Sequence, residues 1–276
     1  MQPLTLTVDA LEAGLYEAFP REDAESWDNP GLSVGDRNSL ITGVALNLDQ
    51  TPEAILAAHE AGCNVLVTHH PPFIKGGPSE LGPASQATLT TPGRVLYEAA
   101  RLGVSVIAMH TCADRAVATR QRYAELLDWE LLGNFEHLIN PARTAQDSGY
   151  GALFAAPQGA TLGNVAATAK DAFGGAPRIW GPRELPVSRI ALLNGSWSEP
   201  EVYDACIAAG IECVIVGETR YHFCTDAMPH LAIIDLGHDI SELPIVDVLQ
   251  DAIVCLGVPT ENIVNLGLSA NNWWSI

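Results

Sequence analysis

The sequence has few basic residues and no long hydrophobic run. Lysine and arginine number 14 of 276 residues, against 33 aspartates and glutamates, so the formal net charge is −19. A chain this acidic repels a phosphate backbone, which argues against non-specific nucleic-acid binding. No apolar run reaches the length of a membrane span, so we expect no membrane partner. The first basic residue is Arg21, so the N-terminus as given lacks the basic region of a secretory signal.

Paired cysteine motifs are also missing. The six cysteines include no Cys-x-x-Cys pair, and in a chain of this size they are typical of reduced thiols in a cytoplasmic protein. The G-x-S-x-G and Walker A signatures are absent, which disfavours a serine hydrolase or a P-loop enzyme. Cys112 lies between His110 and Asp114, but a small buried side chain is a better interpretation of it than thiol catalysis.

The sequence does contain alternating strand and helix patterns. Thr51 and Thr91 each precede a proline, which is typical of a helix start, and Ser198 with Glu201 fits a capping box. The expected strands are 39–48, 63–67, 104–109, 189–193, 211–216 and 231–236. The expected helices are 8–19, 51–61, 91–102, 161–173, 198–209 and one that ends near Val254.

This alternation predicts an α/β fold. We expect two interlocked α/β lobes with mainly parallel or mixed sheets and a metal site in the crevice between them. The stretch 134–188 is rich in Gly, Ala and Pro, which suggests a boundary there. The predicted lobes are residues 1–133 and 134–276.

Polar segments directly follow four of the expected strands, at 68–72, 110–114, 217–222 and 237–242. Ligands in open α/β sheets bind beyond the carboxyl ends of the strands, so these segments are expected to face one crevice. Imidazoles with carboxylates favour Zn, Fe or Mn. Five ligands suit two metal ions about 3.5–4 Å apart rather than one ion. The predicted ligands are His69, His70, Asp114, His238 and Glu242.

The directions of these side chains matter to the prediction. Along an extended chain His69 and His70 point opposite ways and would serve different metals, unless the prolines that follow bend the chain. His238 and Glu242 share one face if their turn is helical.

These residues also have simpler interpretations. A lone histidine is more often hydrogen-bonded or solvent-facing than a ligand, which is how we interpret His59, His137 and His230. Asp114 alone would be a helix N-cap, and Glu242 alone would be a first-turn carboxylate that interacts with a helix dipole. The co-occurrence of three such clusters favours the metal site.

The same motifs resemble those of a known family along nearly the whole chain. They are Trp27-Asp28-Asn29-Pro30-Gly31-Leu32 with Gly35, Thr68-His69-His70-Pro71, His110-Thr111 with Asp114, Gly217-Glu218 with Tyr221-His222, and Gly237-His238 with Ser241-Glu242. Together they resemble the NIF-three-like dinuclear metal-centre family, whose members are called GTP cyclohydrolase 1 type 2 homologues. One departure follows Asp114, where the family usually has a Gly-Gly-Val-Asn-like stretch and this sequence has Arg115-Ala116-Val117-Ala118.

The resemblance implies metal ligands at the five residues predicted above and a homohexameric ring whose metal sites line an inner cavity. Trp273-Trp274 adds aromatic area of the kind found at interfaces. We therefore expect a homo-oligomer, a hexamer by resemblance, that holds two divalent metal ions per chain.

Two functions from different classes remain open. The first is a dinuclear metal-dependent hydrolase that acts on a nucleotide or another small molecule. In it His222 or Glu218 would move protons and His110 would orient Asp114. The alternative is a non-catalytic metal-binding scaffold or a metal-handling regulatory protein. The basic residues nearest the motifs would favour a phosphorylated ligand if they line the cavity: Arg37, Lys75, Arg115 and Arg120.

Overall fold

The computed structural model describes residues 3–86 and 90–267, and the predicted interface residues Trp273-Trp274 lie outside these ranges. The chain forms two compact units. The first contains the residues up to Ala113 and resumes at Ile245, and the second runs from Asp114 to Pro244. The second unit is therefore an insertion in the first, and the chain passes between them twice.

This division differs from the predicted boundary at residue 133. That position ends strand β5 (Glu130–Gly133), which pairs with β6 (Ala152–Ala155) inside the second unit. Residues after Ile245 belong to the first unit because β11 (Ile263–Asn265) pairs with β2 (Val44–Asn47). The two boundaries between the units therefore follow from pairings between strands that are distant in sequence, and not from local composition.

The first unit contains a five-stranded sheet in the order β1-β4-β3-β2-β11. Strand β1 (Gly31–Val34) is antiparallel to β4, and the other neighbours are parallel. Strands β2, β3 (Val65–Thr68) and β4 (Ser105–Ala108) end level, because Asn47 aligns with Thr68 and Thr68 with Ala108. Side chains that follow these strands are thereby brought to one edge of the sheet.

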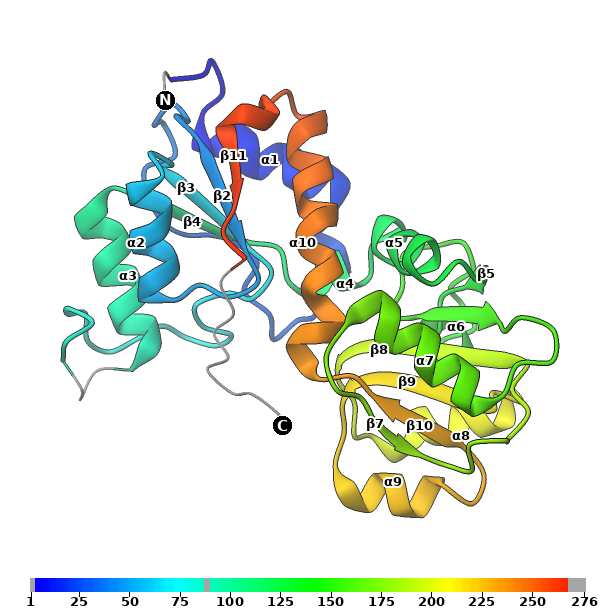
Figure 1. Cartoon of the computed structure of the whole chain (residues 1–276). Helices are drawn as coiled ribbons and strands as arrows, with labels where there is room; N and C mark the ends of the chain where they lie inside the picture. Colours follow the sequence, from blue (N-terminus) through cyan, green and yellow to red (C-terminus); the bar gives the residue numbers. More distant parts are fainter. Residues whose placement is uncertain (1–2, 87–89, 268–276) are drawn as a thin grey trace. The chain divides into compact units, whose positions relative to one another are not determined.

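Helices α2 (Pro52–Glu60) and α3 (Thr91–Leu102) pack on one face of this sheet (Figure 1). The predicted start of α2 is confirmed, since the Thr51 hydroxyl accepts a hydrogen bond from the Ala54 amide. Gly103 ends α3 with φ +69°, a conformation that favours glycine. The remaining short elements and helices of this part of the chain are α1 (Val8–Ala18), η1 (Arg21–Asp23), α4 (Thr111–Asp114) and η2 (Thr260–Asn262).

The second unit contains a six-stranded sheet in the order β5-β6-β8-β9-β10-β7. Strands β8 (Arg189–Ser196), β9 (Cys213–Glu218) and β10 (Ala232–Asp235) are parallel. The flanking pairs are antiparallel, including edge strand β7 (Arg178–Trp180) on β10. The predicted α/β class with mixed sheets is confirmed.

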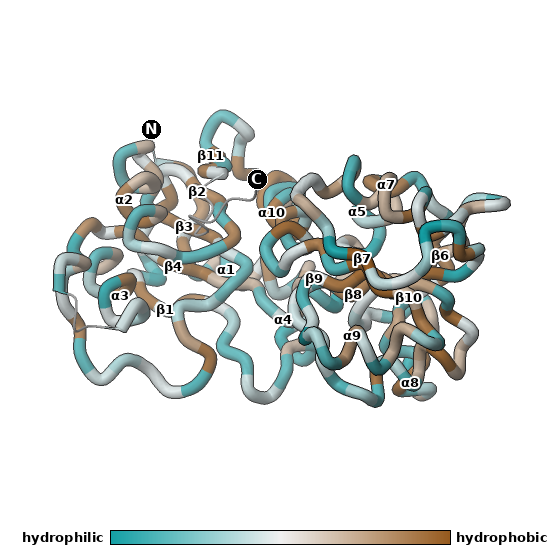
Figure 2. The backbone as a smooth tube through the Cα atoms, turned by 60° about the horizontal axis from the view of Figure 1, so that its bottom comes forward, coloured by the Kyte–Doolittle hydropathy of each residue, from teal (hydrophilic) through white to brown (hydrophobic). Residues whose placement is uncertain are grey.

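Side chains of β8 alternate between two cores. Ile190 and Leu192 pack with α5 (Val117–Leu127) and α7 (Leu162–Phe173), whereas Ala191 and Leu193 pack with α8 (Pro200–Ala208) and α9 (Tyr221–Ala227). This period of two is the mark of a sheet buried on both faces. The most hydrophobic stretches of the tube in Figure 2 accordingly include these central strands. The other helices are α6 (Glu136–Ile139) and α10 (His238–Cys255), which begins in the second unit and ends in the first.

Two local predictions were wrong. The capping box at Ser198 does not form; α8 follows Glu199, and the Ser198 amide donates to the Glu199 carboxylate instead. Residues Gly217 and Glu218 belong to strand β9 rather than to the loop after it. Within the described residues, no helix combines the length and hydropathy needed to cross a bilayer.

Candidate metal centre

Three histidines gather at the carboxyl edge of the first sheet. His69 and His70 follow β3, and His110 follows β4. One ring nitrogen from each lies within 4.8 Å of the other two, and the ring centroids are 5.0–5.6 Å apart. This spacing is short enough for their nitrogens to share a small ligand or metal ion.

Each of these imidazoles is held through Nδ1. His69 Nδ1 lies 2.9 Å from the Met109 carbonyl oxygen, which can only accept, so this nitrogen carries the hydrogen. His70 Nδ1 lies 2.7 Å from Asp49 Oδ1, and His110 Nδ1 lies 2.8 Å from Asp28 Oδ1. Donation from Nδ1 selects the tautomer with its lone pair on Nε2. A carbonyl or carboxylate in this position is the usual support of a metal-binding histidine.

Asp28 is itself fixed by donors. The Thr111 amide and hydroxyl donate to its Oδ2 at 3.0 and 2.5 Å. Burial alone would raise the pKa of Asp28, but the hydrogen bonds from His110 and Thr111 outweigh it and lower the pKa to about 2. Asp28 is therefore an anion near neutral pH and is a firm acceptor for the His110 ring.

The second unit holds further predicted ligands at the start of α10. His238 and Glu242 lie one turn apart in this helix, as predicted, with 3.3 Å between His238 Nε2 and Glu242 Oε2. The other nitrogen of His238, Nδ1, is 3.3 Å from Glu218 Oε1 at the end of β9. Glu218 is thus placed to orient His238.

Asp114 and Glu242 are both buried in this unit. Asn194 donates from Nδ2 to Asp114 Oδ1 at 2.5 Å. Burial raises the pKa of Tyr123 well above its usual value, and the nearby carboxylates of Asp114 and Glu242 raise it further. The Tyr123 hydroxyl therefore stays protonated, and it donates to the Ser241 carbonyl in α10. A divalent cation bound beside these two buried carboxylates would compensate their negative charge.

Close backbone approaches support this helix start. Gly195 has φ +73°, and a Cβ built there would come within 2.7 Å of Glu242 Oε1. Its amide donates to Ser241 Oγ at 3.0 Å, and that hydroxyl donates to the His238 carbonyl. A side chain at residue 195 would displace the Glu242 carboxylate, so glycine lets the end of β8 approach Glu242 as it stands.

The other predicted residues are placed differently. His222 is exposed on α9, and its ring contacts Tyr221. Arg115 forms an ion pair with Glu136, and Arg120 donates to the carbonyls of Gln146 and Asp147. Arg37 forms ion pairs with Asp9 and Glu12, and Lys75 is exposed.

The sequence does not mark the residues that support the predicted ligands. Asp49 and Asn194 lie in none of the motifs, and Asp28 is visible only as part of the motif that begins at Trp27. Asp49 lies two residues beyond the end of β2 and directly after the expected strand 39–48, so its position after a strand is an available signal. The contact of Asp28 with His110 depends on the antiparallel pairing of β1 with β4, which local spacing does not reveal.

Comparison with known proteins agrees with this fold. A family model described as Duf34/NIF3 (NGG1p interacting factor 3) matches residues 6–258. A Clostridium acetobutylicum protein named GTP cyclohydrolase 1 type 2 homolog is 27% identical over 269 residues, which cover 95% of this chain and 96% of that protein.

Solved structures include similar folds. The Staphylococcus aureus hypothetical protein SA1388 has a TM-score of 0.80 at 22% identity, covering 100% of both chains. A Bacillus cereus protein related to NIF3 has a TM-score of 0.79 at 16% identity, covering 99% of this chain and 100% of the other. Because the family model spans most of the sequence, the chain belongs to the Duf34/NIF3 family.

Proposed function

We propose that this chain is a metal-dependent hydrolase that acts on a small phosphorylated molecule and holds two divalent ions when loaded. The proposed ligands are His69, His70, Asp114, His238 and Glu242. The observation that carries the proposal is the histidine group of the first unit, in which each ring is held through Nδ1 by a carboxylate or a carbonyl. Nitrogen and carboxylate donors suit Zn, Fe or Mn.

A bound divalent ion would supply Lewis acidity, which makes water a stronger acid near neutral pH. The chain's own residues orient the histidine rings and move protons. Asp28 and Asp49 set the tautomers of His110 and His70, and Glu218 orients His238. We propose that His110, supported by the anionic Asp28, holds and transfers a proton at Nε2. Glu218 and the exposed His222 remain predictions as proton carriers.

The name of the curated relatives points to a first substrate. Because they are called GTP cyclohydrolase 1 type 2 homologues, we propose GTP first, followed by other nucleotides and phosphoesters. We also propose a homohexamer that works in the cytoplasm, and the six free cysteines support a reducing compartment.

The test combines metal content with turnover. Chain loaded anaerobically with Zn, Fe(II) or Mn should hold about two ions by elemental analysis, as a two-metal site requires. Glu242→Gln should lower this to about one ion or fewer, because the amide keeps the shape but removes the charge. Turnover of GTP should fall with it.

Two variants serve as matched controls. Asp239→Asn removes a charge from the same first turn of α10, and it should cost about 0.3–1 kcal/mol of stability while metal content stays unchanged. His59→Ala removes an exposed histidine of α2 and should leave metal content unchanged in the same way. Equal metal content in Glu242→Gln and wild type would refute Glu242 as a ligand. Full loading without turnover of any substrate would favour the non-catalytic scaffold.

A further inference from the structure

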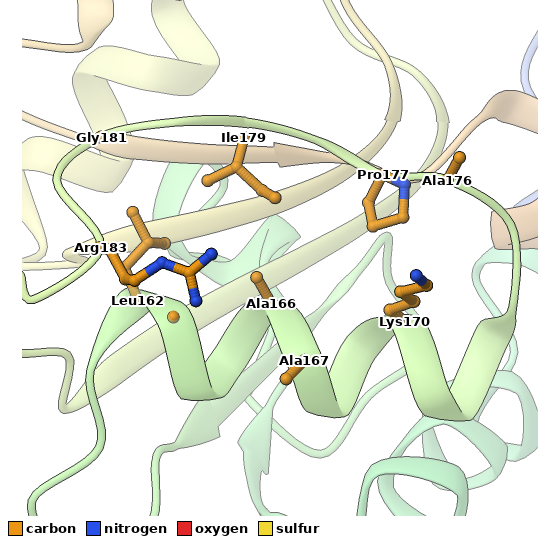
Figure 3. A pocket seen from close by; sticks show the side chains of 10 residues that line it. Leu162, Ala166, Ala167, Lys170, Ala176, Pro177, Ile179, Gly181 and Arg183 are labelled. Carbon is orange, nitrogen blue, oxygen red and sulfur yellow. The ribbon is translucent and has the colours of Figure 1, made fainter. Parts of the chain in front are cut away.

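The second unit contains a cavity of about 450 Å³ between α7 and edge strand β7 (Figure 3). None of the residues that line it is a proposed metal ligand or proton carrier. Its size falls in the lower part of the range of small-molecule pockets, about 300–1,000 Å³. The lining residues are Leu162, Gly163, Ala166, Ala167, Lys170, Ala176, Pro177, Ile179, Gly181 and Arg183.

The walls of the cavity are apolar and built from small residues. Ala166 of α7 forms one side, with Ala167 next to it along the helix, and Ile179 of β7 extends toward Ala166 from the other (Figure 3). Ile179 is 46% exposed, although it lies at the centre of its strand. Small residues facing a branched apolar side chain leave a slot that suits the flat face of a ring.

Two basic side chains lie at the ends of this slot. Figure 3 shows Arg183 near the start of α7 and Lys170 near its end. Neither side chain forms a hydrogen bond or an ion pair with another residue in the described part of the chain. No acidic residue lines the cavity, although the chain has a net charge of −19. This concentration of positive charge in an acidic protein is what an anionic ligand requires.

The backbone amides at the start of α7 are already hydrogen-bonded and do not bind the anion. The amides of Leu162 and Gly163 donate to the carbonyls of Leu185 and Arg183, and the Asn164 amide donates to the Thr161 hydroxyl. An anion in the cavity would therefore be recognised by the two side chains rather than by the helix N-terminus. Lys170 also lies in the last turn of α7, where a cation is favoured by the helix dipole. That explains its position on the helix but not the Arg183 at the opposite end.

We propose that this cavity binds a phosphate monoester of a planar ring system, such as a nucleoside monophosphate. The ring lies in the slot between Ala166 and Ile179, and Arg183 or Lys170 binds the phosphate. The proposal does not depend on the proposed hydrolase activity, because the lining residues contribute nothing to the proposed metal centre.

The test uses methyl NMR of the full chain, followed through Ile179 and Ala166. The probes are phenyl phosphate, adenosine 5′-monophosphate, inorganic phosphate and adenosine. Each titration is run with metal-loaded protein and after metal removal, so that phosphate bound by metal ions is distinguished. We expect saturable shifts with the two organic phosphates in both forms, with affinity that falls as salt rises.

Charge-reversed variants identify the site. Of Arg183→Glu and Lys170→Glu, the variant that removes the phosphate-binding cation should weaken binding of adenosine 5′-monophosphate about tenfold or more, as the loss of a charge-assisted hydrogen bond does. The other variant should weaken it less, through loss of longer-range attraction. Lys75→Glu is the matched control, because it reverses an exposed lysine of the first unit and should leave affinity unchanged. Ala167→Phe should weaken binding by narrowing the cavity from an exposed position while both charges remain.

Three results would overturn the proposal. The absence of saturable shifts with either organic phosphate would show that the cavity is not a site for this class. Equal affinity for adenosine and its monophosphate would show that the two basic side chains do not contribute to binding. Equal affinity for inorganic phosphate and phenyl phosphate would show that the slot does not bind the ring. Loss of turnover in Glu242→Gln would affect none of these readouts, so the two proposals fail separately.

Discussion

At the scale of the residue, Glu212 shows how one carboxylate joins two parallel strands. It lies just before β9 and accepts hydrogen bonds from the Ser188 and Arg189 amides and from the Ser188 hydroxyl at the start of β8. Partial burial would raise the pKa of Glu212, but these hydrogen bonds outweigh it and the pKa is lowered. The ionised form therefore binds its donors better in the folded state than the protonated form does.

We predict that Glu212→Gln lowers stability near neutral pH but not in acid. A carboxyl whose folded pKa is depressed contributes its stability above the unfolded pKa of about 4.3 and loses it as pH falls through the folded value. The site is partly exposed to solvent, which screens the charge, so the difference should be less than about 1 kcal/mol at pH 7. Urea unfolding at pH 7, 5 and 3 checks this, and a difference that grows in acid would contradict it. Glu130→Gln on β5 is the exposed control.

Single residues also show what the sequence predicts and what it leaves out. The chemistry of His69 and His70 is visible in the residue types and in their position after a strand. Their orientation is not visible, because it depends on Met109 and Asp49, which follow neighbouring strands of the sheet. To predict which residues orient these rings, one must know the order and register of the strands, and these depend on contacts between residues far apart in the chain.

At the scale of the element, the end of strand β8, which carries Gly195, has an irregular backbone where it approaches α10. The end of β8 is irregular in its register with β9, between Leu193 and Ser196. Gly195 there takes a positive φ and approaches the Glu242 carboxylate. This local irregularity permits the close contact between the sheet and the first turns of α10.

We predict that Gly195→Ala lowers both stability and metal content. A positive φ costs a residue with a Cβ about 1–2 kcal/mol, and the new methyl group would displace Glu242. Gly210→Ala is the matched control, because Gly210 has φ +68° and a Cβ there meets nothing within 4 Å. Thermal unfolding should show similar losses for both variants. Elemental analysis should show metal loss only for Gly195→Ala, and equal metal content would contradict a role for this approach.

The long elements could be predicted from sequence and the short edge strands could not. Helix α7 is predicted to within one residue, because Thr161 and an apolar periodicity mark it. Strands β7 and β11 are three residues long and were not predicted, since so short a segment carries no readable alternation. Their pairings with β10 and β2 nevertheless complete the two sheets.

At the scale of the whole molecule, charge bears on assembly. A net charge of −19 on each chain makes copies repel one another, and salt or bound cations reduce that repulsion. We predict a homohexamer by light scattering, with the assembled fraction higher in metal-loaded protein and at 0.3 M salt than in metal-free protein at low salt. A monomer under every condition would contradict the proposed assembly.

The insertion of the second unit also has a consequence for synthesis. Strand β2 is made early, but its outer neighbour β11 emerges only after the whole inserted unit. At ribosomal rates of about 5–20 residues per second the nascent chain waits on the order of ten seconds between Ala113 and Ile245. During that time β2 is an uncovered sheet edge, the kind of surface at which nascent chains join one another. Chaperone binding during translation should therefore concentrate on the first unit, although it is begun first.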